Sequence, residues 1–160
     1  MLKPAILYKD ELLKKFSEVV YDDNYFLYMG YAHGHALPQI EDTDFNYQWA
    51  IVDNNKVIGY FAYRIDPSCS VVHNFGLYSF DPGNIIVGKD VFTKMKELIE
   101  KYHRVEWRMI GGNPIQRQYD RFCKKYNGQR VILHDCTKDN YGNYRDDYIY
   151  EIINNKENNI

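Results

Sequence analysis

The sequence predicts an α+β fold in which a mixed, mostly antiparallel central sheet is flanked by about four helices. The chain has 160 residues, 45% of them hydrophobic, which suits one continuous core rather than two domains. Hydrophobic residues change from helical spacing to strict alternation and back along the chain. A strand–helix–strand order near the middle favours one parallel crossover in the sheet. We therefore expect a single domain over residues 1–153 and a frayed tail over 154–160.

The amino-terminal part predicts two helices and a loop. Apolar residues recur at helical spacing from Lys9 to Tyr21, with Asp10 as the expected N-cap, and a shorter helix is expected to end at Gly30. Residues 31–47 hold no period and contain Gly and Pro, as in a loop that contacts substrate. The His-Gly-His triplet at 33–35 has no third ligand near it, so it is more typical of a loop than of a metal site.

From Gln48 onward the hydrophobic period becomes two. Runs at 48–52 and 57–65 flank an Asx-rich turn and predict a β-hairpin, and a third strand is expected over 71–80. After a loop at 81–90, apolar residues at helical spacing predict a helix that ends near Tyr102. The next run, 105–110, predicts a strand parallel to the third.

The carboxyl-terminal part predicts a helix and a second hairpin. The dipeptide Asn113-Pro114 indicates a helix start, because Asn caps free amides and Pro is tolerated in the first turn. The helix is expected to end at Tyr126, before an Asn-Gly stop. Alternating runs at 130–134 and 148–152 flank a turn-rich segment and predict the hairpin.

Charge and composition exclude several classes of protein. The formal net charge is −2, so nucleic acid is not an expected partner, although residues 104–131 hold seven basic and two acidic side chains. The three cysteines form no C-x-x-C pair, and the opening segment is too short for a signal-peptide core, so we expect a cytoplasmic location. No run approaches the roughly 18 apolar residues of a membrane helix, so no membrane partner is expected.

Common catalytic motifs are missing from the sequence. It contains no G-x-x-x-x-G-K-[ST], G-x-S-x-G or H-E-x-x-H motif. No Cys and His residues have metal-ligand spacing, so no metal is expected.

The order of elements resembles the GNAT superfamily of acyl-CoA-dependent N-acetyltransferases over most of the chain. The resemblance depends on a strand–loop–helix at 71–102 and a strand–Asn–helix at 104–126. It implies acetyl-CoA as cosubstrate, splayed fourth and fifth strands, and an amine acceptor that attacks the thioester directly. The acceptor would be a small molecule or a peptide, and the protein a monomer or a homodimer.

The first motif is the pyrophosphate loop, where free amides at a helix N-terminus stabilise a diphosphate. In GNAT proteins it usually reads R/Q-x-x-G-x-G/A. With Gly88 as the last small residue, Ile86 replaces the first Gly and Gly83 replaces the Arg or Gln. An ordinary loop leading into a helix is the alternative. The residues that the resemblance assigns to CoA binding here, through the strand backbone and the loop, are Tyr78, Ser79, Phe80, Gly83, Asn84, Val87, Gly88 and Lys89.

The second motif consists of Asn113, Tyr119 and Gly128. By resemblance, Asn113 contacts the pantetheine arm and Tyr119 protonates the departing CoA thiolate. A phenol with a pKa near 10 suits that donor role, since it is protonated at neutral pH. The alternative is that Tyr119, on the apolar stripe of its helix, belongs only to the core.

The general base is the least defined part of the site. GNAT enzymes often place a carboxylate on or near the fourth strand, but residues 71–80 contain none, so His73 is the candidate base, with a structural role as the alternative. The acceptor is expected to enter from the 30–47 side. A second hypothesis remains open, namely a non-catalytic binding module on the same scaffold, in which the Tyr-rich surface and the cationic segment bind a partner.

Overall fold

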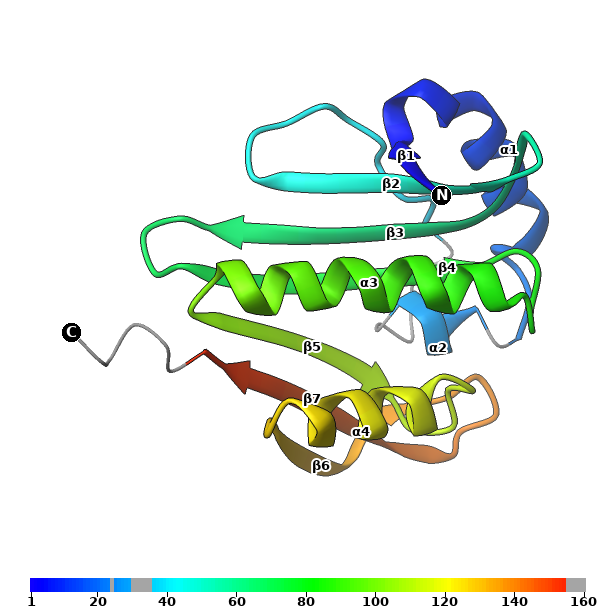
Figure 1. Cartoon of the computed structure of the whole chain (residues 1–160). Helices are drawn as coiled ribbons and strands as arrows, with labels where there is room; N and C mark the ends of the chain where they lie inside the picture. Colours follow the sequence, from blue (N-terminus) through cyan, green and yellow to red (C-terminus); the bar gives the residue numbers. More distant parts are fainter. Residues whose placement is uncertain (24, 30–35, 155–160) are drawn as a thin grey trace.

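A seven-stranded sheet organises the residues that the structure describes, which are 1–23, 25–29 and 36–154 of a computed structural model (Figure 1). The strand order is β1-β2-β3-β4-β5-β7-β6, and among these strands only β4 and β5 run parallel. The predicted α+β class with a mixed, mostly antiparallel sheet is therefore confirmed. The elements in chain order are β1 (Leu2–Pro4), the 3₁₀ helix η1 (Ala5–Tyr8), α1 (Lys9–Val19), α2 (Phe26–Met29), β2 (Asn46–Asp53), β3 (Lys56–Asp66), β4 (Val71–Ser79), α3 (Ile85–Lys101), β5 (Arg104–Ile110), α4 (Gln116–Lys125), β6 (Gln129–Lys138) and β7 (Tyr144–Ile153).

Helices pack on both faces of the sheet. On one face, apolar side chains of α3 and α4 form a core with alternate residues of the strands, such as Phe61 and Trp107. On the other face, η1 and α1 pack against the intervening residues, such as Tyr60 and Tyr78. Because side chains alternate along a strand, each central strand supplies both layers.

Helix α3 begins at Ile85, earlier than the sequence predicted. The side chain of Asn84 accepts a hydrogen bond from the amide of Ile86 at 3.0 Å, which caps the helix. Val87 then continues the buried stripe of Val91 and Met95 at a spacing of four residues. The predicted loop at 81–90 was thus too long, because Gly88 is a helical residue in the first turn.

The predicted N-caps of two other helices were also wrong, although α1 begins at Lys9 as predicted. The N-cap of α1 is Tyr8, so Asp10 lies in the first turn, where its negative charge suits the helix dipole. The N-cap of α4 is Ile115, and Asn113 instead forms a local turn in which its side-chain oxygen accepts from the amide of Ile115 at 3.1 Å. The short β1 was not predicted, because three residues carry too little periodicity; its pairing with β2 defines it.

The β4 and β5 strands diverge after a short parallel contact. Their ladder consists of Val71 with Arg104 and Val72 with Val105, and Figure 1 shows β5 slanting away beyond it. On its other edge β4 has an irregularity opposite Tyr63, where Asn74 has a φ of 53°. Two β4 residues oppose one on β3 there, which is the pattern of a bulge and bends the strand. The sheet is therefore open between its fourth and fifth strands.

Within the described residues, no helix is long and apolar enough to cross a membrane. The predicted tail, apart from Asn154, and the His-Gly-His triplet at 33–35 lie outside the described residues.

Candidate functional site

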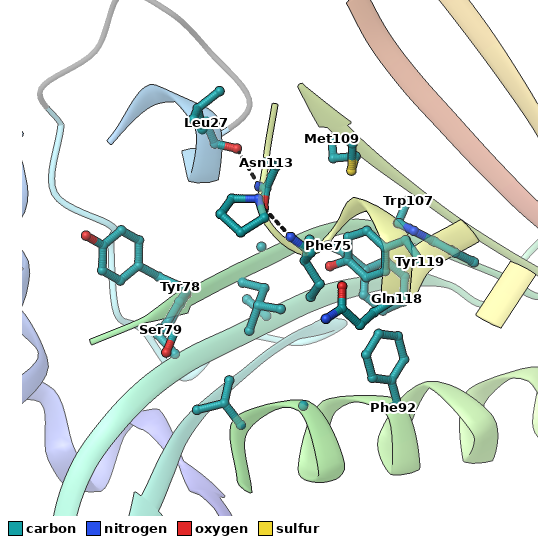
Figure 2. A pocket seen from close by; sticks show the side chains of 18 of the residues that line it. Leu27, Phe75, Tyr78, Ser79, Phe92, Trp107, Met109, Asn113, Gln118 and Tyr119 are labelled. Carbon is teal, nitrogen blue, oxygen red and sulfur yellow. Dashed lines mark hydrogen bonds between the residues drawn. The ribbon is translucent and has the colours of Figure 1, made fainter. Parts of the chain in front are cut away.

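A cleft of about 920 Å³ occupies the opening between β4 and β5 (Figure 2). It continues through the sheet from one face to the other. Its walls come from α3, the turn before α3, and α4 on one face, and from α2, β3 and β5 on the other. The residues that the argument uses are Leu27, Arg64, Asn74, Leu77, Ser79, Gly83, Asn84, Val87, Gly88, Glu106, Arg108, Asn113 and Tyr119, all of which line the cleft.

The edge of β4 that faces the cleft offers backbone groups for a ligand. The Phe80 amide donates to the Ile58 carbonyl at 2.9 Å, so this residue pairs toward β3. Because the direction of main-chain groups alternates in an antiparallel ladder, those of Leu77 and Ser79 face away from β3, into the opening. Of the three predicted strand contacts, Ser79 is thus placed toward the cleft. Tyr78 also lines the cleft, and its ring packs against Phe16 of α1 on the other face of the sheet, whereas Phe80 does not line the cleft.

The amino-terminal turn of α3 forms the second set of backbone donors. The first amides of a helix have no partner within it, and the dipole makes this end positive. In the described part of the chain, the Asn84 side chain satisfies the amide of Ile86 only, which leaves those of Ile85 and Val87 for a ligand. The predicted Gly83, Asn84, Val87 and Gly88 all line the cleft, whereas Lys89 does not.

Tyr119 is the central side chain of the α4 wall. Its ring packs against Phe92, Trp107 and Tyr150, with ring centroids 5.7 to 5.9 Å away. Burial raises the pKa of Tyr119 above the ordinary 10.0 of a phenol, so the hydroxyl keeps its proton at neutral pH. A buried, protonated phenol beside an open cleft has a proton to donate to a departing group, and the raised pKa makes it a weaker acid than a free phenol.

Asn113 lines the cleft, but its side-chain amide is engaged within the protein. The nitrogen donates to the carbonyl of Leu27 at 2.9 Å, and the oxygen accepts from the amide of Ile115. Figure 2 shows the Leu27 contact as a bridge from α2 to the turn before α4. The side chain therefore positions α2 across the opening between β4 and β5.

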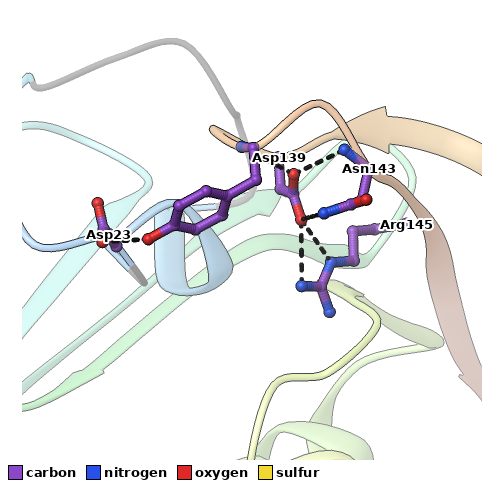
Figure 3. Close-up of polar contacts among 5 residues, drawn as sticks. Asp23, Asp139, Asn143 and Arg145 are labelled. Atoms are coloured by element: carbon purple, nitrogen blue, oxygen red, sulfur yellow. Dashed lines mark hydrogen bonds and ion pairs between the residues drawn. The ribbon is translucent and has the colours of Figure 1, made fainter.

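The β6–β7 turn contacts the segment that precedes α2. The hydroxyl of Tyr141 donates to the carboxylate of Asp23 (Figure 3). The turn is built on buried Asp139, which accepts the amides of Tyr141 and Asn143 at 3.0 and 2.8 Å and pairs with Arg145. Burial raises the pKa of Asp139, but the hydrogen bonds from Asn143 and Arg145 outweigh it and hold that pKa below its usual value. Together with the bond from Asn113 to Leu27, the contact of this turn with Asp23 holds α2 in position.

The wall on the α2 face carries charged side chains that sequence reasoning missed. Glu106 is the only carboxylate among the described residues that line the cleft, and it lies on β5 rather than β4. Val105 and Trp107 on either side of it are buried, so the alternation in this strand was the available signal. His73 does not line the cleft; it is the register partner of Arg64 on β3.

Within the described residues, no three His, Cys, Asp or Glu side chains are grouped so that they can hold a metal ion. The chemistry available in the cleft is that of backbone donors, the phenols of Tyr60, Tyr78 and Tyr119, a carboxylate and guanidinium groups.

No protein-family description and no curated protein match this chain. Solved structures do. A ribosomal-protein-alanine N-acetyltransferase from Brucella melitensis has a TM-score of 0.67 and 15% identity, and the match covers 96% of this chain and 99% of that one. A probable acetyltransferase of the GNAT family from Chromobacterium violaceum has a TM-score of 0.63 and 16% identity over 94% and 85% of the two chains.

A ribosomal L7/L12 alpha-N-protein acetyltransferase, solved in complex with coenzyme A, has a TM-score of 0.53 and 15% identity. That match covers 68% of this chain and 62% of the other. At these identities the likeness concerns the fold. The strand order, the opening between β4 and β5 and these matches together lead to one conclusion: this chain has the fold of the GNAT acetyltransferases.

Proposed function

We propose that this protein is an N-acyltransferase that moves an acetyl group from acetyl-CoA to an amine by direct attack. The observation that carries the proposal is the cleft through the opening between β4 and β5, with backbone donors at one end and Tyr119 on its wall. A thioester placed in this opening is accessible from both faces of the sheet. The donor and the acceptor can therefore approach from opposite sides.

The donor is assigned to the side that α3 and α4 cover. The amides of Ile85 and Val87 at the positive end of α3 suit a diphosphate. The outward main-chain groups of Leu77 and Ser79 suit the amides of a pantetheine arm, which pair like an added strand. The residues present therefore fit acetyl-CoA through their main-chain groups. Because main-chain amides would bind the diphosphate, the departure of this loop from the R/Q-x-x-G-x-G/A pattern matters less than its side chains suggest.

The acceptor is assigned to the side with Glu106. Its carboxylate attracts the acceptor ammonium and takes the proton that the amine loses. The amine nitrogen then bonds to the thioester carbonyl carbon while the carbon–sulfur bond breaks. Tyr119 donates its proton to the departing thiolate. The nitrogen loses a second proton as the amide forms, and this proton restores Tyr119 through solvent, so the products are the acetylated amine, free CoA thiol and the one proton that Glu106 passes to solvent. The complex of a related fold with coenzyme A supports this choice of donor.

The alternative function, a non-catalytic binding module, has one observation in its favour. Asn113, which the resemblance assigned to the pantetheine arm, uses its amide to hold α2 in place. The two functions differ in whether the cleft accepts acetyl-CoA.

Isothermal titration of the purified protein with acetyl-CoA tests the proposal, and mass spectrometry of a mixture with an amine panel tests transfer. We expect saturable one-to-one binding and an acceptor that gains one acetyl group. Folded protein that gives no binding heat at millimolar acetyl-CoA contradicts the proposal and favours the binding module.

A further inference from the structure

The sheet face that bears Glu106 carries a row of polar side chains at the mouth of the cleft. Arg64 on β3 is the register partner of His73 on β4, and the β4–β5 ladder ends at Val72 with Val105, one residue before His73 and Glu106. Residues paired in this way share a face. Because β4 and β5 diverge after their last pair, the backbones of Arg64 and Glu106 are separated by at least two strand spacings, about 10 Å.

The Glu106 end of this row has an excess of negative charge. Glu106 on β5 lies directly opposite Glu151 on β7. The guanidinium of Arg104 bridges them, at 2.6 Å from Glu106 and 3.0 Å from Glu151. One cation against two carboxylates leaves this cluster negative, which favours an ammonium group beside Glu106.

The Arg64 end is positive. Arg64 is exposed, lines the cleft, and has no ion pair or hydrogen bond with any residue in the part of the chain that the structure describes. A guanidinium in this state presents its full fork of donors to a planar anion. Arg108, the neighbouring cation on the wall, is different, because it pairs with buried Asp147, which Thr137 also contacts at 3.1 Å. Arg108 is thus a fixed, neutralised part of the wall.

We propose that the acceptor is a primary amine that also carries a carboxylate, with the ammonium group at Glu106 and the carboxylate at Arg64. The inference rests on the proposed function and names its substrate class. The row is negative at Glu106 and positive at Arg64, so it is complementary to a ligand with a cation at one end and an anion at the other. A polyamine is disfavoured, because Arg64 repels its second ammonium group. An amine that carries no other charged group gains nothing from Arg64. A free amino acid and a peptide with an acidic side chain near its amino terminus both offer this chemistry.

The experiment compares matched acceptors with acetyl-CoA as donor. One arm uses each of the twenty L-amino acids against its α-carboxamide, with spermidine as a cationic acceptor. The other arm uses the peptide amides Ala-Glu-Ala and Ala-Gln-Ala. We expect kcat/KM at least about tenfold higher for the carboxylate member in one arm, the effect of one charge-assisted contact. The arm that shows the difference identifies the source of the carboxylate.

Variants of Arg64 assign the effect to this side chain. Arg64→Gln is expected to raise KM for the preferred carboxylate acceptor about tenfold, with the KM for acetyl-CoA and for the matched amide unchanged within twofold. Arg64→Lys is expected to restore part of the loss, because it returns the charge without the planar fork. Arg121→Gln, which removes one exposed cation from α4 outside the cleft, is the matched control and is expected to behave as the unmodified protein.

The outcomes separate the two proposals. If acetyl-CoA binds but neither arm shows the difference, or spermidine reacts as fast as the preferred carboxylate, the inference is wrong and the proposed function stands. The inference is also wrong if Arg64→Gln slows the carboxylate and amide acceptors equally. If the protein gives no binding heat with acetyl-CoA, the proposed function is wrong, and the inference fails with it.

Discussion

The side-chain nitrogen of Asn113 donates a hydrogen bond to the main-chain carbonyl of Leu27, 2.9 Å away and buried. This contact joins α2 to the turn before α4, two segments that are distant in the sequence. Since α2 packs against both β4 and β5, the bond fixes the helix that spans their opening. The residue that the sequence suggested as a ligand contact is thus part of the frame of the site.

Replacing Asn113 is expected to destabilise the protein. Asn113→Ala removes the bond from Ile115 and, from the Leu27 carbonyl, the side-chain donor found among the described residues, so the free energy of unfolding should fall by about 1–3 kcal/mol. Urea denaturation measures this. Asn140→Ala, at an exposed position, is the control and should shift the unfolding free energy by less than about 0.5 kcal/mol. Equal stabilities of the two variants would contradict the structural role of Asn113.

Tyr119→Phe is expected to lower kcat by about 10²–10⁴-fold, the usual contribution of a general acid, with little change in the affinity for acetyl-CoA. The reason is that the ring keeps its packing and only the proton donor is lost. Steady-state kinetics and calorimetry measure the two quantities. Tyr126→Phe, at the end of the same helix and outside the cleft, is the control. A kcat within twofold of the unmodified enzyme would assign Tyr119 to the core alone.

Glu106→Gln is expected to change the pH dependence of the reaction as well as its rate. Without the carboxylate, the acceptor must lose its proton to the solvent, so the rate should fall about 100-fold at neutral pH and recover as the pH approaches the pKa of the amine. Glu151 still pairs with Arg104 in the variant, so the fold is expected to persist. A rate loss that is the same at every pH would indicate a structural role instead.

Five buried tyrosines predict a loss of stability in alkali. Burial raises the pKa of each above the 10.0 of a free phenol; they are Tyr25, Tyr60, Tyr63, Tyr119 and Tyr150. Above pH 10 these phenols ionise in the unfolded chain first, so the free energy of unfolding falls as pH rises, whereas below pH 10 their contribution is constant. Urea midpoints between pH 8 and 11 measure the slope. Tyr119→Phe should reduce it, and an unchanged slope would place the ionisations elsewhere.

Two glycines are expected to respond oppositely to alanine. At Gly88, in the first turn of α3, a Cβ has no neighbour within 4 Å, so Gly88→Ala should stabilise the helix by about 0.5–1 kcal/mol. At Gly128, a Cβ lies 2.5 Å from the Glu151 carbonyl and 2.7 Å from the Cys123 sulfur, so Gly128→Ala should destabilise the protein. Thermal melting compares them. A larger residue, as in Gly88→Phe, projects into the cleft and should weaken acetyl-CoA binding while α3 remains folded.

Local pattern predicted most elements but misplaced several boundaries. The β2–β3 hairpin, β4 and β5 followed from alternation, because each strand buries one or both of its faces. The start of α3 was wrong because Gly88 resembled a loop residue, whereas Asn84 supplies the cap four residues earlier. The predicted start of α4 was two residues early, because the Asn113 oxygen caps a turn through the Ile115 amide and the regular helix begins only at Gln116. The partner of the Asn113 nitrogen, Leu27, is one that no local pattern reveals.

The residues of the candidate site were also predicted only in part from the sequence. The resemblance assigned Gly83, Asn84, Val87 and Gly88 to CoA binding, and all four line the cleft, since a turn into a helix exposes amides wherever it occurs. Glu106 was missed, because the alternation of β5 shows which face its side chain is on but not what lies on that face.

The sequence by itself determined the type and order of the elements, the resemblance to a known fold and the phenol on the wall of the cleft, because hydrophobic period and turn residues act over a few positions. Only the tertiary structure decided where β4 and β5 separate, and that Arg64 and Glu106 share one mouth. The physical reason is that strand order and divergence depend on pairing between distant segments. A side chain becomes part of a site through the neighbours that this pairing brings to it.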